Sequence, residues 1–369
     1  NSRFVYNGYV RAAVSGPSIA GPRTPSVAQL YLHQAAWDGS ELAFKTPNAT
    51  EYRLSLTIPT PSEVLQAAVR DSGHSYEVND KARQIRGAVN RGDDLGMYRH
   101  PTTVAVIQSL TANVGRDLSN QLRRLRESGD VSEESIEALR VASLLGHRPA
   151  RPLLDLRSLV LERGGLAANL GDVMAELVAR GHVEMGFLAT CSLCGLNEFQ
   201  PLTQYSAGTT RCYGCGSPAV LGADIYGSPV VNYRLSTLMQ TVSLNGGLVP
   251  LAAVALLLEE RFYIEPGVDI SRDGAQVGEL DLLGWQGPTL VGGEAKTSAA
   301  AVALLDPDAE VAKAAAVGIT SYVLCCLEQI DETVSDAFDR AAGERGITFR
   351  LLDRPNLLAP APAPAPEAG

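Results

Sequence analysis

Acidic side chains and a lysine gather on two neighbouring segments of the sequence. Residues 278–285 read GELDLLGW, and residues 289–298 read TLVGGEAKTS. Their apolar residues, and the Gln-Gly-Pro turn between them, predict two adjacent strands. Side chains alternate between the faces of a strand, so Glu279 shares a face with Asp281, and Glu294 with Lys296. If the faces coincide, the converging carboxylates repel one another unless a cation lies between them, and their hard oxygens suit Mg²⁺ or Mn²⁺.

This pattern resembles the core of the PD-(D/E)xK superfamily of restriction-endonuclease-like nucleases. In that core an Asp ends one strand, and the next strand carries Glu-x-Lys. Asp281 matches the Asp, Glu294 and Lys296 match Glu-x-Lys, and Leu280 replaces the Pro of the family name. The resemblance implies a divalent metal bound by Asp281, Glu294 and the carbonyl oxygen of Ala295. It also implies that Lys296 orients or activates the attacking water.

The alternative for these residues is an exposed, salt-bridged hairpin without a catalytic role. The apolar neighbours of the acids favour the nuclease interpretation, because unpaired charges in buried strands are costly. In the superfamily, a helix before the first strand often contributes another acid. Glu260, or its neighbour Glu259, matches that position, although a solvated helix end explains these glutamates equally well.

Two Cys-x-x-Cys-Gly sequences form a second motif, with Cys191 and Cys194 in one and Cys212 and Cys215 in the other. Two thiolates at this spacing bind one side of a tetrahedral ion, and the second pair completes the coordination. The motif resembles a zinc ribbon. Four cysteine ligands leave no open coordination position, so we expect a structural Zn²⁺. Two disulfides or a redox-active Cys-x-x-Cys are the alternatives.

The predicted elements indicate an α/β fold class with several domains. From residue 248 on, we expect helix, three strands, helix, strand, helix and strand, which matches the α-β-β-β-α-β core that the resemblance implies. Residues 102–145 predict a helical hairpin, residues 229–240 the start of a helical linker, and residues 299–317 one helix. The expected parts are a mixed α+β region of unreadable role at 1–150, a loosely winged-helix-like segment with the zinc ribbon at 151–246, a nuclease domain at 247–357, and an extended Ala-Pro tail at 358–369.

The net charge of −10 is unevenly distributed. From residue 247 to the end, 8 basic residues stand against 19 acidic ones, a net charge of −11, whereas residues 1–246 are about neutral. A domain this acidic repels a phosphate backbone over most of its surface. We therefore expect either that the metal and Lys296 form a local attractive site, or that another part of the chain, a partner protein or an oligomer holds the nucleic acid.

Composition narrows the class of protein further. Hydrophobic residues make up 45% and charged residues 20%, as in globular proteins. The longest apolar run, residues 249–258, is too short to cross a membrane, so no membrane association is expected. Four of the six cysteines lie in the metal pattern, which indicates a reducing, cytoplasmic compartment. The sequence begins with neither an initiator Met nor a signal peptide, which suggests a fragment of a longer protein.

These features predict a metal-dependent endonuclease that hydrolyses the phosphodiester bonds of nucleic acid. DNA is favoured as the substrate, although the sequence does not decide between DNA and RNA. The resemblance also suggests an effector of bacterial defence against foreign DNA. The alternative is a catalytically inactive scaffold of the same fold that binds nucleic acid or protein within a larger assembly. The acidic C-terminal region favours that alternative.

Overall fold

A computed structural model shows how the chain folds. It describes the backbone at 35–37, 41–45 and 51–55, and the residues 60–89, 95–111, 148–204, 210–224 and 226–358. The chain divides into two compact units, Asn1–Glu63 and Val64–Gly369. In the first unit, an antiparallel sheet is formed by β1 (Ala35–Trp37), β2 (Glu41–Lys45) and β3 (Glu51–Ser55).

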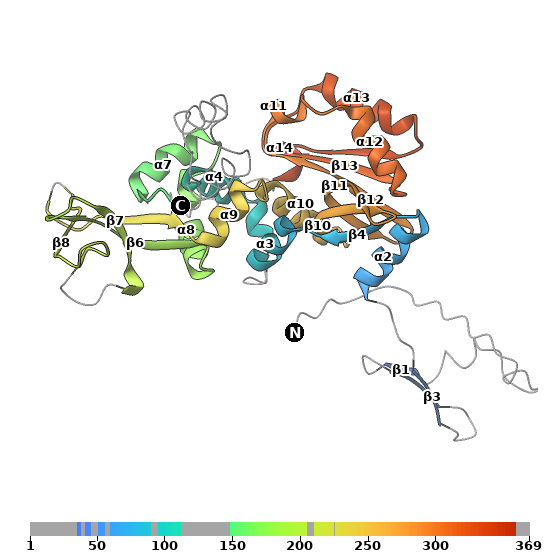
Figure 1. The fold of residues 1–369 in the computed structure, drawn as a ribbon, viewed down its shortest axis with the longest axis horizontal. Coiled ribbons are helices and arrows are strands. Elements are labelled where there is room, and N and C mark those ends of the chain that lie inside the picture. Colours follow the sequence, from blue (N-terminus) through green and yellow to red (C-terminus); the bar gives the residue numbers. More distant parts are fainter. Residues whose placement is uncertain are drawn as a thin grey trace, which may run out of the picture. The chain divides into compact units, whose positions relative to one another are not determined.

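A six-stranded mixed sheet organises one part of the second unit, in the order β14-β13-β12-β11-β10-β4 (Figure 1). Its central strands β10 (Tyr263–Arg272), β11 (Ala275–Gln286) and β12 (Thr289–Lys296) are antiparallel. The strands β13 (Ser321–Cys326) and β14 (Thr348–Leu352) continue the sheet in parallel. At the other edge, β4 (Ser75–Val78) pairs antiparallel with β10. The mixed α/β fold class is thereby confirmed.

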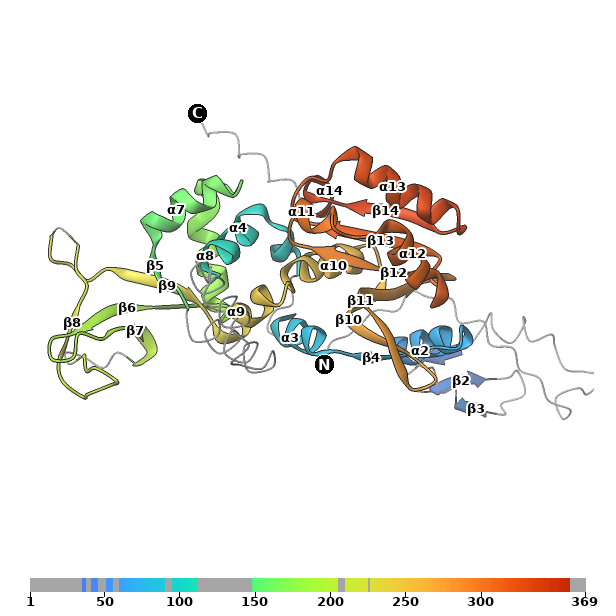
Figure 2. The same ribbon diagram turned by 45° about the horizontal axis from the view of Figure 1, so that its top comes forward.

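Helices cover both faces of this sheet (Figure 2). The helix α10 (Leu248–Glu259) is buried almost throughout, because its apolar residues surround its axis and pack in the same core as Leu282, Val291 and Val323. The other face packs against α2 (Pro61–Asp71), α12 (Pro307–Ala316) and α13 (Glu332–Gly343). Shorter elements beside the sheet are α3 (Asp80–Val89), α11 (Ala299–Val302) and α14 (Arg354–Leu357).

A second sheet contains the two cysteine pairs. Its order is β5-β9-β6-β7, and β8 also pairs with β6. The core around α10 continues through the helices next to this sheet, so the two sheets share one apolar core. The strands are β5 (Arg151–Pro152), β6 (Val183–Cys191), β7 (Asn197–Pro201), β8 (Ala219–Leu221) and β9 (Val231–Leu235), and the helices are η1 (Gly96–Arg99), α4 (Pro101–Leu110), α7 (Leu153–Glu162), η2 (Ala167–Asn169), α8 (Leu170–Ala179), η3 (Leu202–Gln204) and α9 (Thr237–Leu244).

Two expected helices differ from the structure. Residues 231–235 form β9, which pairs with β6, and α9 begins only after Ser236, whose side chain caps the helix. The helix expected over 299–317 is interrupted between α11 and α12. Asp306 accepts hydrogen bonds from the first turn of α12 and Pro307 opens it, so this segment starts a new helix. Of the helical hairpin expected over 102–145, α4 forms the start, and residues 112–147 lie outside the described residues.

The boundaries expected at residues 150 and 247 remain predictions. The structure adds that β4 belongs to the six-stranded sheet, although the whole segment 151–246, which contains the two cysteine pairs, separates it in the sequence from the other five strands. Within the described residues, no single helix is long and apolar enough to cross a membrane; α9 and α10 meet that test only as a pair bent by 94°.

Candidate functional site

Asp281 and Glu294 lie at the point where β11 and β12 part. The regular ladder between these strands ends at the pair Leu282–Gly293, and one further step in the same register would oppose Asp281 to Glu294. There the backbone N–H of Ala295 donates to Asp281 Oδ2 at 2.9 Å. Both carboxylates are nearly buried, with side chains 5% and 8% exposed.

The glycine before Glu294 holds β12 close to its neighbour. A Cβ atom at Gly293 would lie only 1.7 Å from the carbonyl oxygen of Val323 on β13. Any side chain at this position would therefore push the two strands apart and move Glu294 with them. This close approach gives a physical reason for the Gly-Gly pair in the sequence.

Lys296 joins the two acids. Its Nζ lies 2.7 Å from Glu294 Oε2 and 3.3 Å from Asp281 Oδ2. The structure thus brings together the three side chains that the sequence analysis selected. The hydrogen bond from the Ala295 N–H also orients its carbonyl, because the N–H and C=O groups of a strand residue point to the same side of the strand.

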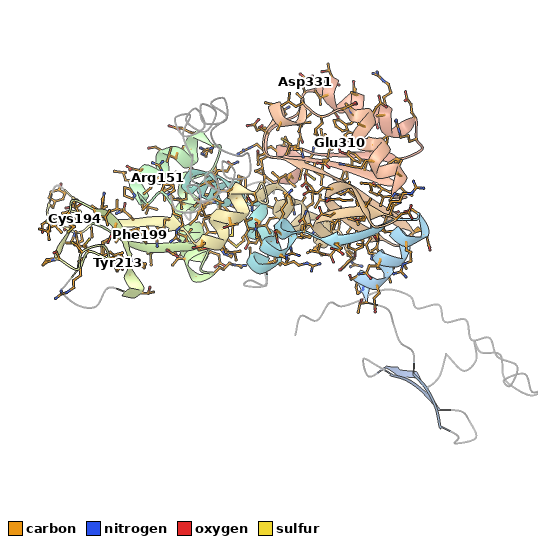
Figure 3. The ribbon with its side chains drawn as sticks, in the orientation of Figure 1. Arg151, Cys194, Phe199, Tyr213, Glu310 and Asp331 are labelled. Carbon is orange, nitrogen blue, oxygen red and sulfur yellow. The ribbon has the colours of Figure 1, made fainter. Side chains whose placement is uncertain are left out.

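Two more lysines complete the cluster, one from each flanking helix. Lys81 on α3 lies 2.5 Å from Asp281 Oδ1 and 3.0 Å from Glu279 Oε1. Lys313 on α12 lies 2.8 Å from Glu294 Oε1 and 2.5 Å from Glu310 Oε2; Figure 3 labels Glu310. Acids and ammonium groups therefore alternate in a continuous chain of contacts, which we call the acid–lysine row: Glu279, Lys81, Asp281, Lys296, Glu294, Lys313 and Glu310.

The row shifts the pKa values of its two inner acids in opposite directions. Burial opposes ionisation of Asp281, but the charges of Lys81 and Lys296 outweigh it and lower the pKa of that carboxyl. Burial and the nearby charge of Asp281 raise the pKa of Glu294 in spite of Lys296 and Lys313. For Lys296, burial is outweighed by the two acids, and its pKa rises to about 12. Lys296 is therefore a cation at neutral pH.

The donor set at this position fits a small divalent cation. Asp281 and Glu294 present carboxylate oxygens to one place, and Ala295 directs its carbonyl to the same side of β12. Mg²⁺ and Mn²⁺ prefer oxygen ligands of this kind. These three residues are the ones that would hold such an ion.

The structure does not bring Glu260 to this site. Its carboxylate forms a two-pronged pair with Arg350 on β14, with distances of 2.5 Å and 2.6 Å to the two guanidinium nitrogens. Its hydrogen bonds with Arg350 lower the pKa of Glu260 and keep it charged. The neighbouring Glu259 pairs with Arg99 instead. The candidate helix acid therefore contributes to an ion pair away from the row.

Lys81 and Lys313 were missed by the sequence analysis, yet composition contains a signal for them. The chain has 31 basic residues, and only four of them are lysines: Lys45, Lys81, Lys296 and Lys313. Three of these four meet in one row. Because the chain uses arginine almost everywhere else, and the two side chains are not interchangeable, the rare lysines are themselves a signal of a site.

The four motif cysteines also meet. Their Sγ atoms lie within 4.8 Å of one another, and Cys191–Cys215 and Cys194–Cys212 are separated by 3.4 Å and 3.6 Å. These distances exceed a disulfide bond of about 2.05 Å. They approach the edge of about 3.8 Å that follows from Zn–S bonds of about 2.3 Å in a tetrahedron. The four thiols are therefore placed to bind one Zn²⁺.

Local backbone geometry fixes these thiols. In the first knuckle, the N–H groups of Leu193 and Cys194 point at Cys191 Sγ, both at 3.4 Å. Gly195 and Gly216 have φ angles of 69° and 73°, which close the two turns without steric strain. Figure 3 labels Cys194 and Tyr213, one from each knuckle, and Phe199 on β7.

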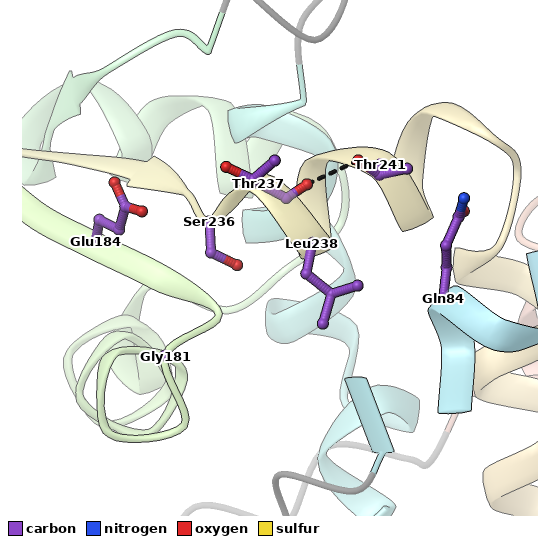
Figure 4. A pocket seen from close by; sticks show the side chains of 7 residues that line it. All are labelled: Gln84, Gly181, Glu184, Ser236, Thr237, Leu238 and Thr241. Atoms are coloured by element: carbon purple, nitrogen blue, oxygen red, sulfur yellow. Dashed lines mark hydrogen bonds between the residues drawn. The ribbon is translucent and has the colours of Figure 1, made fainter. Parts of the chain in front are cut away.

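A pocket of about 560 Å³ lies elsewhere, beside the start of α9 (Figure 4). Glu184 is the only ionisable group among its lining residues, and it pairs with Arg148 and Arg234. None of the residues selected from the sequence lines this pocket. Its lining residues are Gln84, Gly181, Glu184, Ser236, Thr237, Leu238 and Thr241.

Fold and site together define a mixed α/β protein with a four-cysteine cluster and an acid–lysine row. Neither a protein-family profile nor a curated protein matches the sequence. Among solved structures, the chain is similar to protein VC1899 from Vibrio cholerae, with 11% identity and a TM-score of 0.35, over 86% of this chain and 63% of that one. It is also similar to Can2 from Sulfobacillus thermosulfidooxidans, solved in complex with cyclic tetra-adenylate, with 10% identity and a TM-score of 0.27, over 84% of this chain and 61% of that one. The chain thus spans less than two thirds of either structure, and similarity at these scores carries no information on function.

Proposed function

We propose that the chain is a nuclease that uses Mg²⁺ or Mn²⁺ to hydrolyse phosphodiester bonds of nucleic acid, with DNA as the expected substrate. The observation that carries this proposal is the meeting of Asp281, Glu294 and Lys296 where β11 and β12 part. An ion-paired surface hairpin would leave its acids exposed. These two acids are nearly buried and contact the same ammonium group, and such burial is costly unless positive charge accompanies them.

Each residue has a role that follows from its position. Asp281 and Glu294 would hold the ion, together with the Ala295 carbonyl. When bound, the ion supplies charge to the scissile phosphate and lowers the pKa of a coordinated water. Lys296, which stays protonated, donates hydrogen bonds that orient the attacking water or stabilise negative charge on the phosphate oxygens. The Ala295 N–H keeps Asp281 aimed at the site.

The experiment is cleavage of plasmid DNA and of single-stranded DNA and RNA with Mg²⁺ or Mn²⁺. We expect Asp281→Asn and Lys296→Met to lose at least about 100-fold in rate, since each removes a group that acts on the ion or the phosphate. Arg83→Met is the matched control for loss of one positive charge, because Arg83 pairs with Asp80 and does not contact the row. Equal cutting by wild type, D281N and K296M would refute the proposal.

The second candidate is a scaffold that binds nucleic acid or protein without cleaving it. The ion pairs of the row favour it, because every oxygen of Asp281 and Glu294 already has a cationic partner, and such a network can be purely structural. A scaffold predicts binding of nucleic acid or of a protein partner without metal-dependent cleavage. A role in defence, which the family resemblance suggests, predicts protection against phage that is lost in Lys296→Met.

The four cysteines hold a structural zinc in this proposal. Cysteine sulfurs would fill all four coordination positions of the ion, which leaves no position for a substrate. Zinc would therefore stabilise the β6–β8 region, and the chemistry would take place at the acid–lysine row.

A further inference from the structure

Lysine ammonium groups contact all four oxygens of the two inner acids of the row. Asp281 Oδ1 faces Lys81 and its Oδ2 faces Lys296, while Glu294 Oε1 faces Lys313 and its Oε2 faces Lys296. A divalent cation that binds the same carboxylates would meet these ammonium groups at close range. Like charges at such distances repel strongly in a partly buried site. Metal entry therefore requires the flanking lysines to move off the acids.

The flanking lysines can move off the acids toward solvent. The side chains of Lys81 and Lys313 are 22% and 24% exposed, whereas the acids they bind are 5% and 8% exposed. Each flanking lysine is thus more exposed than the inner acid that it contacts, and its ammonium group is at the end of a long flexible stem. An anion arriving from solvent can therefore reach Lys81 and Lys313 without entering the space between Asp281 and Glu294, although the outer acids Glu279 and Glu310 are partly exposed beside them. The three ammonium groups of the row offset most of the charge of its four acids, so a phosphate meets less repulsion here than over the rest of a region whose net charge is −11.

A buried hydroxyl near the row leaves room for a water or a polar ligand. Tyr322 on β13 is fully buried, and its hydroxyl has no hydrogen-bond partner among the described residues. Tyr322 lies opposite Gly292 in the register of β12 and β13, so its side chain is on the same face of the sheet as that of Glu294. Burial first, and then nearby acids such as Glu294, raise the pKa of this hydroxyl. A buried hydroxyl without a protein partner is normally satisfied by water or a ligand.

We propose that Lys81 and Lys313 are phosphate-binding residues that move from the acids to the phosphates of the nucleic acid when the divalent ion enters, so that metal and substrate bind cooperatively. This inference rests on the proposed metal site, and it adds two residues and a coupling to it. The coupling is reciprocal: nucleic acid must raise metal affinity by the same factor by which metal raises affinity for nucleic acid. Without phosphate, both lysines compete with the metal for Asp281 and Glu294.

The test measures Mn²⁺ binding by calorimetry, with and without a short single-stranded DNA oligonucleotide whose integrity is checked afterwards by gel. For the wild type, we expect the oligonucleotide to raise Mn²⁺ affinity by about 10-fold, within the usual range for coupled sites. In the double variant Lys81→Met, Lys313→Met, the protein without DNA should bind Mn²⁺ more tightly than the wild type. The oligonucleotide should then change its Mn²⁺ affinity less than about 2-fold.

The matched control is Arg83→Met, Arg345→Met, which removes two positive charges that pair with Asp80 and Asp308 and not with the row. It should keep the wild-type coupling. Zinc content and circular dichroism check that each variant folds. Should the double variant fail to fold, the single variants take its place, and each is expected to lose part of the coupling.

The outcomes separate the two proposals. Coupling that is lost in the lysine variants, in a protein that cuts nothing, supports the inference and counts against the nuclease. Metal-dependent cutting with the same coupling in wild type and lysine variants supports the nuclease and overturns the inference. Weaker Mn²⁺ binding by the lysine variants without DNA overturns it too. A wild type that binds no Mn²⁺ in either condition overturns both.

Discussion

Replacing Lys296 by Met tests the electrostatics of the row without any assay of activity. Lys296 is the ammonium that Asp281 and Glu294 share. Removing one partner of a buried ion pair costs about 3–5 kcal/mol when the other charge is left alone. Here each acid keeps a second ammonium, from Lys81 or Lys313, and the lysine is 28% exposed. We therefore expect a smaller loss of about 2 kcal/mol in the free energy of unfolding at neutral pH.

The same variant has a defined dependence on pH. Burial, and then the charge of Asp281, already raise the pKa of Glu294, and loss of Lys296 must raise it further. A carboxyl with a raised pKa in the folded state holds its proton more tightly there than in the unfolded chain. Stability therefore falls as pH rises from the ordinary value of 4.5 through the raised pKa. The cost of Lys296→Met should be small near the ordinary value and full at neutral pH.

The chain offers a local probe for this measurement. It has two tryptophans, Trp37 in the first unit and Trp285 on β11, four residues beyond Asp281. In a Trp37→Phe background, the fluorescence of Trp285 reports unfolding of the six-stranded sheet in urea, measured at about pH 4.5 and about pH 7.5. The control Arg83→Met breaks an exposed pair and should change stability by less than about 0.5 kcal/mol at both pH values. A Lys296→Met protein that is as stable as the wild type, or that loses the same amount at both pH values, would refute the reasoning.

Two other predictions concern the remaining motifs. Purified protein should contain one zinc per chain by atomic absorption, and Cys194→Ser should lose it and make the β6–β8 region sensitive to protease, because the metal ties the two knuckles together; a zinc-free wild type with the same protease resistance would contradict this. Glu260→Gln should leave metal-dependent cleavage unchanged, because Glu260 pairs with Arg350 and not with the row. Its effect on stability should stay below about 1 kcal/mol, because the pair is partly exposed, and a large loss of cleavage would return Glu260 to the site.

The sequence was sufficient to predict what depends on local pattern. The run from α10 to β14 appears in the expected order, because its strands are apolar and its helices carry clear start signals such as Asp331 before α13. The four cysteines meet as their spacing predicts. Asp281, Glu294 and Lys296 also meet, because they lie on adjacent strands joined by a short turn.

The rest depends on contacts between distant segments. The pairing of β4 with β10 joins residues almost two hundred positions apart, and it places α3 and Lys81 beside Asp281. No periodicity within residues 75–89 specifies that partner. The strand β9 was missed for a similar reason. Its five residues form a strand because they pair with β6. The apolar residues of the same segment also suit a helix, so the local pattern does not decide between the two. The pairing of Glu260 with Arg350 is of the same kind, because the position of Glu260 in the sequence does not reveal that β14 brings Arg350 beside it.

The choice of lysine over arginine in the row calls for a physical reason. Arginine supplies 27 of the 31 basic residues, so positive charge alone would not select lysine at three positions of one cluster. The planar guanidinium tends to donate bidentate hydrogen bonds to both oxygens of one carboxylate, as Arg350 does to Glu260. Each lysine of the row instead places a compact ammonium between two different carboxylates.

Substitution by arginine therefore separates charge from geometry. In Lys81→Arg, Lys313→Arg, both charges remain, so stability should stay within about 1 kcal/mol of the wild type. The two guanidinium groups would hold Asp281 and Glu294 bidentately and resist release, so Mn²⁺ affinity measured by calorimetry should fall below that of the wild type, in the direction opposite to the change expected for the methionine variant. If the arginine variant binds Mn²⁺ as tightly as the methionine variant, the ammonium groups do not compete with the metal, and the row is a structural ion-pair network.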